Sequence, residues 1–213
     1  MDFNLKAFKV GTADPVSVRA TKDGDLRVVP ALPPKAELVR LGCGWEARIA
    51  TASAFTYVNA LPTTRAEIML YNGEPAGGKS YVVDSAWMFG ITSMAAAQPI
   101  VLIAQLVPSS TMVAPTHSAT TTILNSLSGK ANYSGYAKRA VAVTTCFTDL
   151  WSVVAQGLVP APTTNLAASV YGDLFGKYVV PPGAGFGLAG VAGTAAGTAI
   201  IGVAWYEVQL ELA

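Results

Sequence analysis

Charged side chains are scarce in this sequence. Asp, Glu, Lys and Arg make up 13% of its 213 residues, against about 25% in typical soluble domains. The 14 basic residues nearly cancel the 13 acidic ones, for a formal net charge of +1. Because nothing in this balance suggests a basic face that would hold a polyanion, we expect no strong nucleic-acid partner.

Histidine and cysteine are almost absent. His117 is the single histidine, which excludes a histidine-based metal cage, and a Ser-His-Asp triad would have to run through it. Its surroundings, APTHSATTT, are typical of a small-residue loop, and no GxSxG motif occurs. Cys43 and Cys146 make no disulfide framework; we expect buried free thiols, and a pair between them stays open. The sequence therefore predicts no catalytic residue, no metal ligand, no cofactor, and a protein that is not an enzyme.

Signals for targeting and for ligand loops are also missing. The N-terminus, MDFNLKAFKV, has no apolar core of a secretory signal, so the sequon Asn132-Tyr133-Ser134 is interpreted as accidental. The stretch GGKS at residues 77–80 is a poor phosphate-binding motif because we expect no helix after it. Two uncharged windows, residues 85–107 and 186–204, approach the ~20 residues of a membrane span. Neither has a basic flank, so buried β-structure is favoured over membrane insertion.

The charges that are present cluster in the first half of the chain. Residues 1–100 carry 19 of the 27 charged side chains, and the other 113 residues carry eight. Extended apolar surface usually marks an interaction site. We therefore expect the second half of the chain to contribute both to the core of the subunit and to contacts between subunits. The alternative is a single well-covered sandwich with a Ser- and Thr-rich exterior.

The C-terminal stretch reads as β-structure. Tyr206, Val208 and the leucines after them alternate with Glu207, Gln209 and Glu211, which predicts a half-buried strand with the apolar set inward. The preceding residues, 186–204, hold too much glycine for a soluble helix and favour strand, turn and strand. The chain is thus predicted to close on a long antiparallel hairpin.

A second hairpin is predicted in the middle of the chain. The strand TRAEIMLYN is followed by a loop that starts at Asn72-Gly73 and then by GKSYVVDSAWMFGIT. In that second strand five large residues are expected on one face: Tyr81, Val83, Trp87, Phe89 and Ile91. Residues 35–41 are also predicted as a strand, residues 108–129 as a long loop, and residues 148–156 and 163–175 as short helical turns.

The N-terminal residues 1–34 are interpreted as an arm: a hairpin around Asp23-Gly24 and then a Pro-rich linker. Residues 35–213 form the body of what we predict to be one domain. Many short strands with Pro and Gly at the bends indicate an all-β fold, an antiparallel β-sandwich of the jelly-roll type with long loops and at most short helical turns.

At this point the chain resembles virion structural proteins of the jelly-roll kind, such as phage coat, decoration and head-fibre proteins. The resemblance rests on RAEIMLYN, the loop, GKSYVVDSA, and the ending YVVPPG to WYEVQLEL. It implies a bacteriophage or viral structural subunit that self-assembles into a symmetric homo-oligomer through apolar contacts, in a virion or in a cytoplasmic assembly. Other virion proteins are possible partners. It implies no functional residue.

Two other functions stay open. One is a carbohydrate- or ligand-binding sandwich whose aromatic side chains stack on sugars, the candidates being Trp45, Trp87, Tyr133, Tyr136, Trp151 and Trp205. The other is a membrane-associated or pore-forming protein that uses the Gly-rich C-terminal stretch. The virion role, the symmetry and any ligand are left undecided by the sequence.

Overall fold

The computed structural model describes residues 6–8, 15–17, 34–50, 53–92, 97–115, 121–129, 139–144, 147–159, 169–193 and 197–210. The chain divides into two compact units, residues 1–37 and 38–213. In the first unit, β1 (Lys6–Phe8) pairs with β2 (Pro15–Ser17) in antiparallel fashion. The segment predicted to pair with residues 16–20, residues 26–28, lies outside the described residues.

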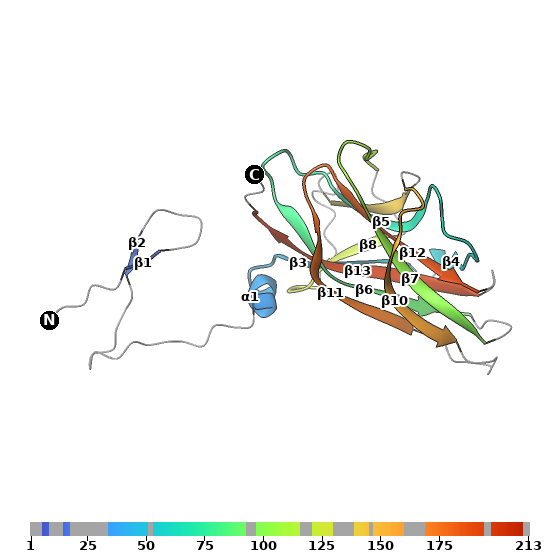
Figure 1. Ribbon diagram of the computed structural model, residues 1–213. Helices are drawn as coiled ribbons and strands as arrows, with labels where there is room; N and C mark the ends of the chain where they lie inside the picture. Colours follow the sequence, from blue (N-terminus) through green and yellow to red (C-terminus); the bar gives the residue numbers. More distant parts are fainter. Residues whose placement is uncertain are drawn as a thin grey trace, which may run out of the picture. The chain divides into compact units, whose positions relative to one another are not determined.

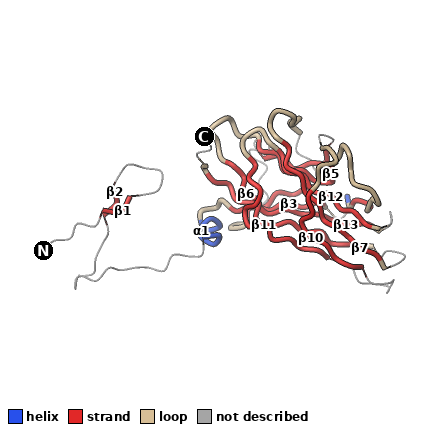
Figure 2. Tube along the Cα trace, viewed as in Figure 1, coloured by secondary structure: helices blue, strands red, loops and turns tan. Residues whose placement is uncertain are grey.

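The second unit is a sandwich of two antiparallel sheets, which confirms the predicted fold class (Figure 1). Sheet I has the order β10 (Ser152–Val159), β7 (Gln98–Val107), β12 (Gly185–Ala192), β5 (Ala66–Asn72), β9 (Arg139–Thr144). Sheet II has the order β11 (Ser169–Val180), β6 (Ser80–Gly90), β13 (Thr198–Val208), β3 (Gly44–Ile49), β8 (Thr121–Asn125), and β4 (Phe55–Thr56) pairs with the start of β13. Figure 2 shows how completely strands dominate this unit.

The strand pairs are nested, as in a jelly roll. β3 pairs with β13, β5 with β12, β6 with β11, and β7 with β10, and successive pairs alternate between the two sheets. This is the arrangement of one long antiparallel hairpin rolled into a double sheet. β8 and β9 are inserted between β7 and β10 in the sequence, and each adds an edge to one sheet beside β3 and β5.

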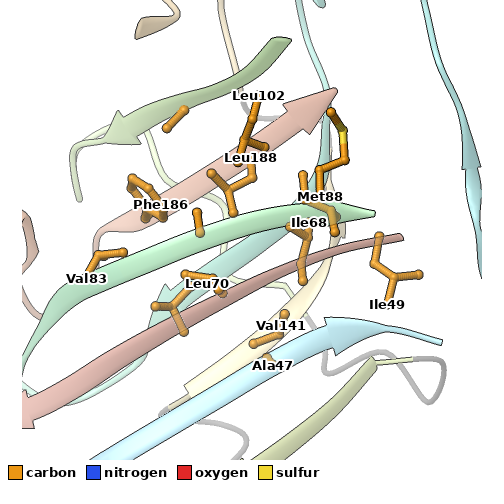
Figure 3. Close-up of a cluster of buried hydrophobic side chains, with 14 of the residues drawn as sticks. Ala47, Ile49, Ile68, Leu70, Val83, Met88, Leu102, Val141, Phe186 and Leu188 are labelled. Atoms are coloured by element: carbon orange, nitrogen blue, oxygen red, sulfur yellow. The ribbon is translucent and has the colours of Figure 1, made fainter. Parts of the chain in front are cut away.

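The main hydrophobic core fills the space between the sheets (Figure 3). Sheet I contributes Ile68, Leu70, Leu102, Val141, Phe186 and Leu188, and sheet II contributes Ala47, Ile49, Val83 and Met88. Each fully buried large aliphatic side chain stabilises the fold by about 1.5–3 kcal/mol. The core therefore holds the two sheets face to face and leaves their outer faces for other contacts.

The predicted hairpin of TRAEIMLYN with GKSYVVDSA is wrong, because β5 and β6 lie in different sheets. Asn72 makes the corner between them and is fully buried. Its Nδ2 donates to the carbonyls of Lys79 and Val180, both at 2.9 Å, and its Oδ1 accepts from the Glu74 amide at 3.1 Å. Gly183 N also donates to Asn72 O. One side chain thus ties the β5–β6 crossover to the β11–β12 crossover.

The GGKS stretch belongs to the same corner. Residues 73–80, GEPAGGKS, match the spacing of a phosphate loop, yet they lead into strand β6 rather than into a helix. A phosphate loop needs a helix N-terminus to complete its ring of amides. The expectation that no helix follows this motif is confirmed.

The prediction of a C-terminal hairpin is also wrong. So is the prediction that Tyr206 and Val208 of its last strand face the core. β12 lies in sheet I and β13 in sheet II, although both segments are strands as predicted. Trp205 and Glu207 point toward the core, with 1% and 5% of their surface exposed, whereas Tyr206 and Val208 are only half-buried. The strand alternates as the sequence predicts, but the two faces are exchanged. Glu207 can face inward because it has a buried partner, and the local sequence does not show that partner.

The prediction that five large residues within 81–91 share one face is wrong after Val83, and a β-bulge in β6 explains why. Tyr81 and Val83 are in the core as predicted, but Ser85 pairs with Ala204 while Val83 pairs with Trp205, so Asp84 is an extra residue. One extra residue reverses the facing of everything after it. Met88 therefore enters the core, while Trp87, Phe89 and Ile91 do not.

Several local assignments also change. Residues 35–41 were expected as a strand, but Pro34–Arg40 is helix α1. It ends in a Schellman motif, in which Cys43 N donates to Leu38 O, Gly42 N donates to Val39 O, and Gly42 has φ +73°. The predicted helical turns at 148–156 and 163–175 overlap strands β10 and β11, and the predicted loop at 108–129 contains β8. Cross-strand pairing overrides weak local propensity at these places.

Candidate interaction surfaces

Some residues singled out from the sequence lie outside the described part of the chain. They are His117, Cys146 and the sequon residues with Tyr136. Cys43 is a free, half-buried thiol. Among the described residues, no three His, Cys, Asp or Glu side chains come together as a metal site would require. No helix of the described chain is both long enough and apolar enough to span a membrane.

Three of the candidate sugar-stacking tryptophans have internal contacts instead. Trp45 and Trp205 belong to the core. Trp151 stacks on Phe147, with ring centroids 5.4 Å apart, and its Nε1 donates to Pro62 O at 2.7 Å. Of the candidates in the described chain, Trp87 is the one that lies on an outer face outside both cores.

Part of the outer face of sheet I is covered by the chain itself. Phe147 lies over Gly187, where an added Cβ would meet the ring at 2.2 Å. Gln105 fixes this segment, since its Nε2 donates to Thr148 Oγ1 at 2.7 Å and its Oε1 accepts from Thr148 N at 3.1 Å. Met112 covers Gly185 in the same way. These contacts form a second, smaller core over β12 and β5.

The rest of that outer face is uncharged, and the exposed side chains that its edge strand β10 contributes are Val153, Gln156 and Leu158; we call it the β10–β7–β12 face. None of these three adjacent strands contains a charged residue. Val153 and Leu158 of β10 are 61% and 69% exposed. Val101 pairs with Val191 and both are half-buried, whereas the next outward pair on β7 and β12, Ile103 with Ala189, is 2% and 1% exposed. The exposed apolar part of this face therefore lies on β10. β10 ends the sheet, so its outer edge is unpaired among the described strands.

The outer face of sheet II is different; we call it the Trp87 face. Trp87 lies between the core residues Ala86 and Met88, so it points outward. It is half-buried and lies across Gly202, whose added Cβ would be 2.4 Å from the indole carbons Cε2 and Cζ2. Tyr171, 60% exposed, pairs with Trp87 on one side, and Arg48 pairs with Gly202 on the other. Tyr171, Trp87, Gly202 and Arg48 thus form one cross-strand row.

The neighbouring row of the Trp87 face contributes two carboxylates. Asp173 pairs with Ser85, Ser85 with Ala204, and Ala204 with Glu46. Asp173, Glu46 and Arg48 are all exposed. The aromatic row therefore has a guanidinium at one end and carboxylates beside it, in contrast to the uncharged β10–β7–β12 face.

A buried ion pair joins the two sheets. Arg139 of β9 in sheet I places Nε 2.7 Å from Glu207 Oε1 of β13 in sheet II, and their side chains are 12% and 6% exposed. The Arg139 guanidinium also lies 3.6 Å above the Trp45 ring centroid. Among the described residues, Arg139 Nη1 has no hydrogen-bond partner. Sequence analysis missed this pair because its members lie on separate strands.

Burial controls the protonation of the groups around this pair. Desolvation raises the pKa of Glu207 above its usual value of 4.5, and the Arg139 charge opposes that rise. Desolvation and the Glu207 charge raise the pKa of Tyr81, the residue that pairs with Glu207 in the sheet. The Arg139 charge is therefore the largest influence that favours the charged form of Glu207 against desolvation.

Comparisons with known proteins do not identify a family for this chain. No family model matches the chain, and no curated protein matches it. Among solved structures it is similar to one described as "CryoEM structure of Mud Crab Dicistrovirus", with 12% identity over 100% of this chain and 89% of that chain, and a TM-score of 0.18. At this TM-score the likeness supports no conclusion about fold or function.

Proposed function

We propose that this chain is a structural subunit of a symmetric protein assembly, and that the assembly is a virion in which it serves as a coat or decoration protein. The observation that carries the proposal is the β10–β7–β12 face, an uncharged apolar surface on a jelly-roll domain. Jelly rolls recur in viral capsid proteins, where they tile through contacts at their sides. The proposal includes no catalytic activity.

The β10–β7–β12 face suits a second copy of the same chain. An unpaired edge beside exposed apolar side chains is a hazard for a free monomer, since it invites association with other chains. Natural edges are protected by charged residues, by β-bulges or by a covering segment; β10 has a bulge at Val154 but no charged residue. A second copy presents the same uncharged surface, so a two-fold contact would bury apolar groups of both copies without leaving any charge unpaired.

Such a contact has a characteristic response to salt. The three strands of the contact carry no charge, so salt has no electrostatic attraction between the copies to screen. Salts that are excluded from protein surfaces strengthen the burial of apolar groups. We therefore expect an oligomer whose mass, measured by size-exclusion chromatography with light scattering, does not fall when salt is raised.

Leu158→Lys tests the face directly. The substitution places a charge on the edge strand of the proposed contact, on a side chain that is exposed in the single subunit. We expect the fold to survive, judged by far-ultraviolet circular dichroism, and the oligomer to dissociate. Burying an unpaired charge costs several kcal/mol, which is enough to disrupt a contact of moderate affinity.

Ser126→Lys is the matched control, because Ser126 is an exposed residue directly after β8, and β8 lies at the end of sheet II opposite β11, the strand that packs against β10. It adds the same charge to an edge that the proposal leaves outside the contact, so its mass should equal that of the unmodified protein. A monomeric unmodified protein at micromolar concentration, or equal masses for both variants, would refute the assembly proposal.

A further inference from the structure

We propose that the Trp87 face binds a short, neutral oligosaccharide, with Trp87 as the ring on which a sugar stacks and Tyr171 as a second contact beside it. This binding site lies on sheet II and is separate from the uncharged face of sheet I. The inference does not depend on the assembly proposal.

The first observation is the way in which Trp87 is held. The space that a side chain at position 202 would occupy is filled by the Cε2, Cζ2 and Nε1 side of the indole, so the Trp87 ring packs against the backbone of β13. The neighbours Ala86 and Met88 belong to the core, so the Trp87 side chain is directed to the outer face, where it is half-buried. The half-buried indole and the exposed ring of Tyr171 beside it offer the aromatic surface on which the apolar face of a pyranose ring can stack.

The second observation is the set of polar groups around this platform. A sugar that stacks on an aromatic ring also directs hydroxyl groups sideways, and these need donors and acceptors. Arg48 supplies guanidinium donors at the end of the aromatic row, and Glu46 and Asp173 supply carboxylate acceptors in the next row. Hydroxyl groups match both kinds of partner.

The charges also decide between possible ligands. The two carboxylates outnumber the single guanidinium, so the face is net negative and disfavours uronic acids, sialic acids and nucleic acid phosphates. The centres of protein interfaces are depleted in charged residues, which makes this face a poorer fit for a second protein than the β10–β7–β12 face. A neutral oligosaccharide is the ligand that uses both the ring and its polar surroundings.

The test is titration of the complete protein with four defined probes: cellohexaose, maltohexaose, xylohexaose and mannohexaose. Isothermal calorimetry and tryptophan fluorescence report the binding. We expect at least one probe to bind with a Kd of about 1 mM or tighter. Trp87→Ala should weaken that binding by about tenfold or more, and Tyr171→Ala should weaken it to a smaller extent.

Val153→Ala is the control, because Val153 is as exposed as Tyr171 and lies on the other sheet. It should leave the Kd unchanged, and circular dichroism should show all three variants folded. The inference is overturned if none of the four probes binds at about 10 mM, or if Trp87→Ala binds as well as the unmodified protein. It is equally overturned if Trp87→Ala lowers the mass of an oligomer, which would make the Trp87 face a protein interface.

Discussion

Replacing Arg139 by Met tests what the buried ion pair contributes. Met keeps the unbranched apolar stem of Arg139 and removes the guanidinium. Glu207 would then remain between the sheets with 6% of its side chain exposed and without the partner whose Nε lies 2.7 Å away. Removing one member of a buried pair costs about 3–5 kcal/mol, because the other charge is left without compensation. The total stability of a domain is about 5–15 kcal/mol, so Arg139→Met should lower the urea midpoint markedly.

The double variant Arg139→Met/Glu207→Gln separates this penalty from lost packing. With both charges gone, no carboxylate is left to be desolvated, and most of the lost stability should return. The Trp45 ring loses its cation in both variants, so that contribution cancels in the comparison. Urea unfolding at constant temperature, followed by tryptophan fluorescence, measures both differences.

The pH dependence provides a second measurement. Glu207 has a raised pKa in the folded protein, so the folded state binds its proton more tightly than the unfolded state does. For such a group, stability falls as pH rises from the ordinary pKa of 4.5 through the folded pKa. Arg139 lowers the folded pKa, so its removal raises that pKa further and widens the window. Arg139→Met should therefore regain stability on acidification toward pH 5, and the double variant should not show this gain.

Two outcomes would refute the reasoning. A loss of less than about 1 kcal/mol for Arg139→Met at pH 7 would mean that the Glu207 carboxylate is effectively solvated in the folded protein. A double variant as unstable as the single one would mean that the damage is lost packing of the arginine stem and not an uncompensated charge.

Two further predictions concern the fold. Asn72→Ala removes the side chain that serves two crossovers and should cost about 1–3 kcal/mol by leaving buried carbonyls unpaired, measured by urea unfolding; a loss within error would contradict the role given to this corner. Gly202→Ala should destabilise by about 1–3 kcal/mol and shift the fluorescence of Trp87, because the new methyl group meets the indole, whereas Gly193→Ala meets nothing closer than 3.5 Å and should be neutral. Equal effects at the two glycines would contradict the placement of the indole against Gly202.

The class of fold and the scarcity of charge on the surface could both be predicted from the sequence alone. Alternation in β3, β5 and the C-terminal segment, with glycine-rich connections, allowed an antiparallel sandwich and excluded a helical protein. The shortage of charge was visible from composition, and its concentration in the first half of the chain left β7, β10 and β12 without any. Signals of this kind are readable because they depend on residues near one another in the chain.

Tertiary structure decided which strands pair and which side chains face inward. The nested pairing of β3 with β13 and of β5 with β12 joins distant segments, and local turn signals such as Asn72-Gly73 favour hairpins that do not form. One extra residue, Asp84, reversed the facing of half of β6 and brought Trp87 to the outer face. Glu207 is buried only because folding brings Arg139 beside it from the opposite sheet. The two-residue alternation of side chains is a property of one strand and is visible in its sequence. Which face of the strand turns inward, and which strand lies beside it, depend on contacts that exist only after the sheets have packed.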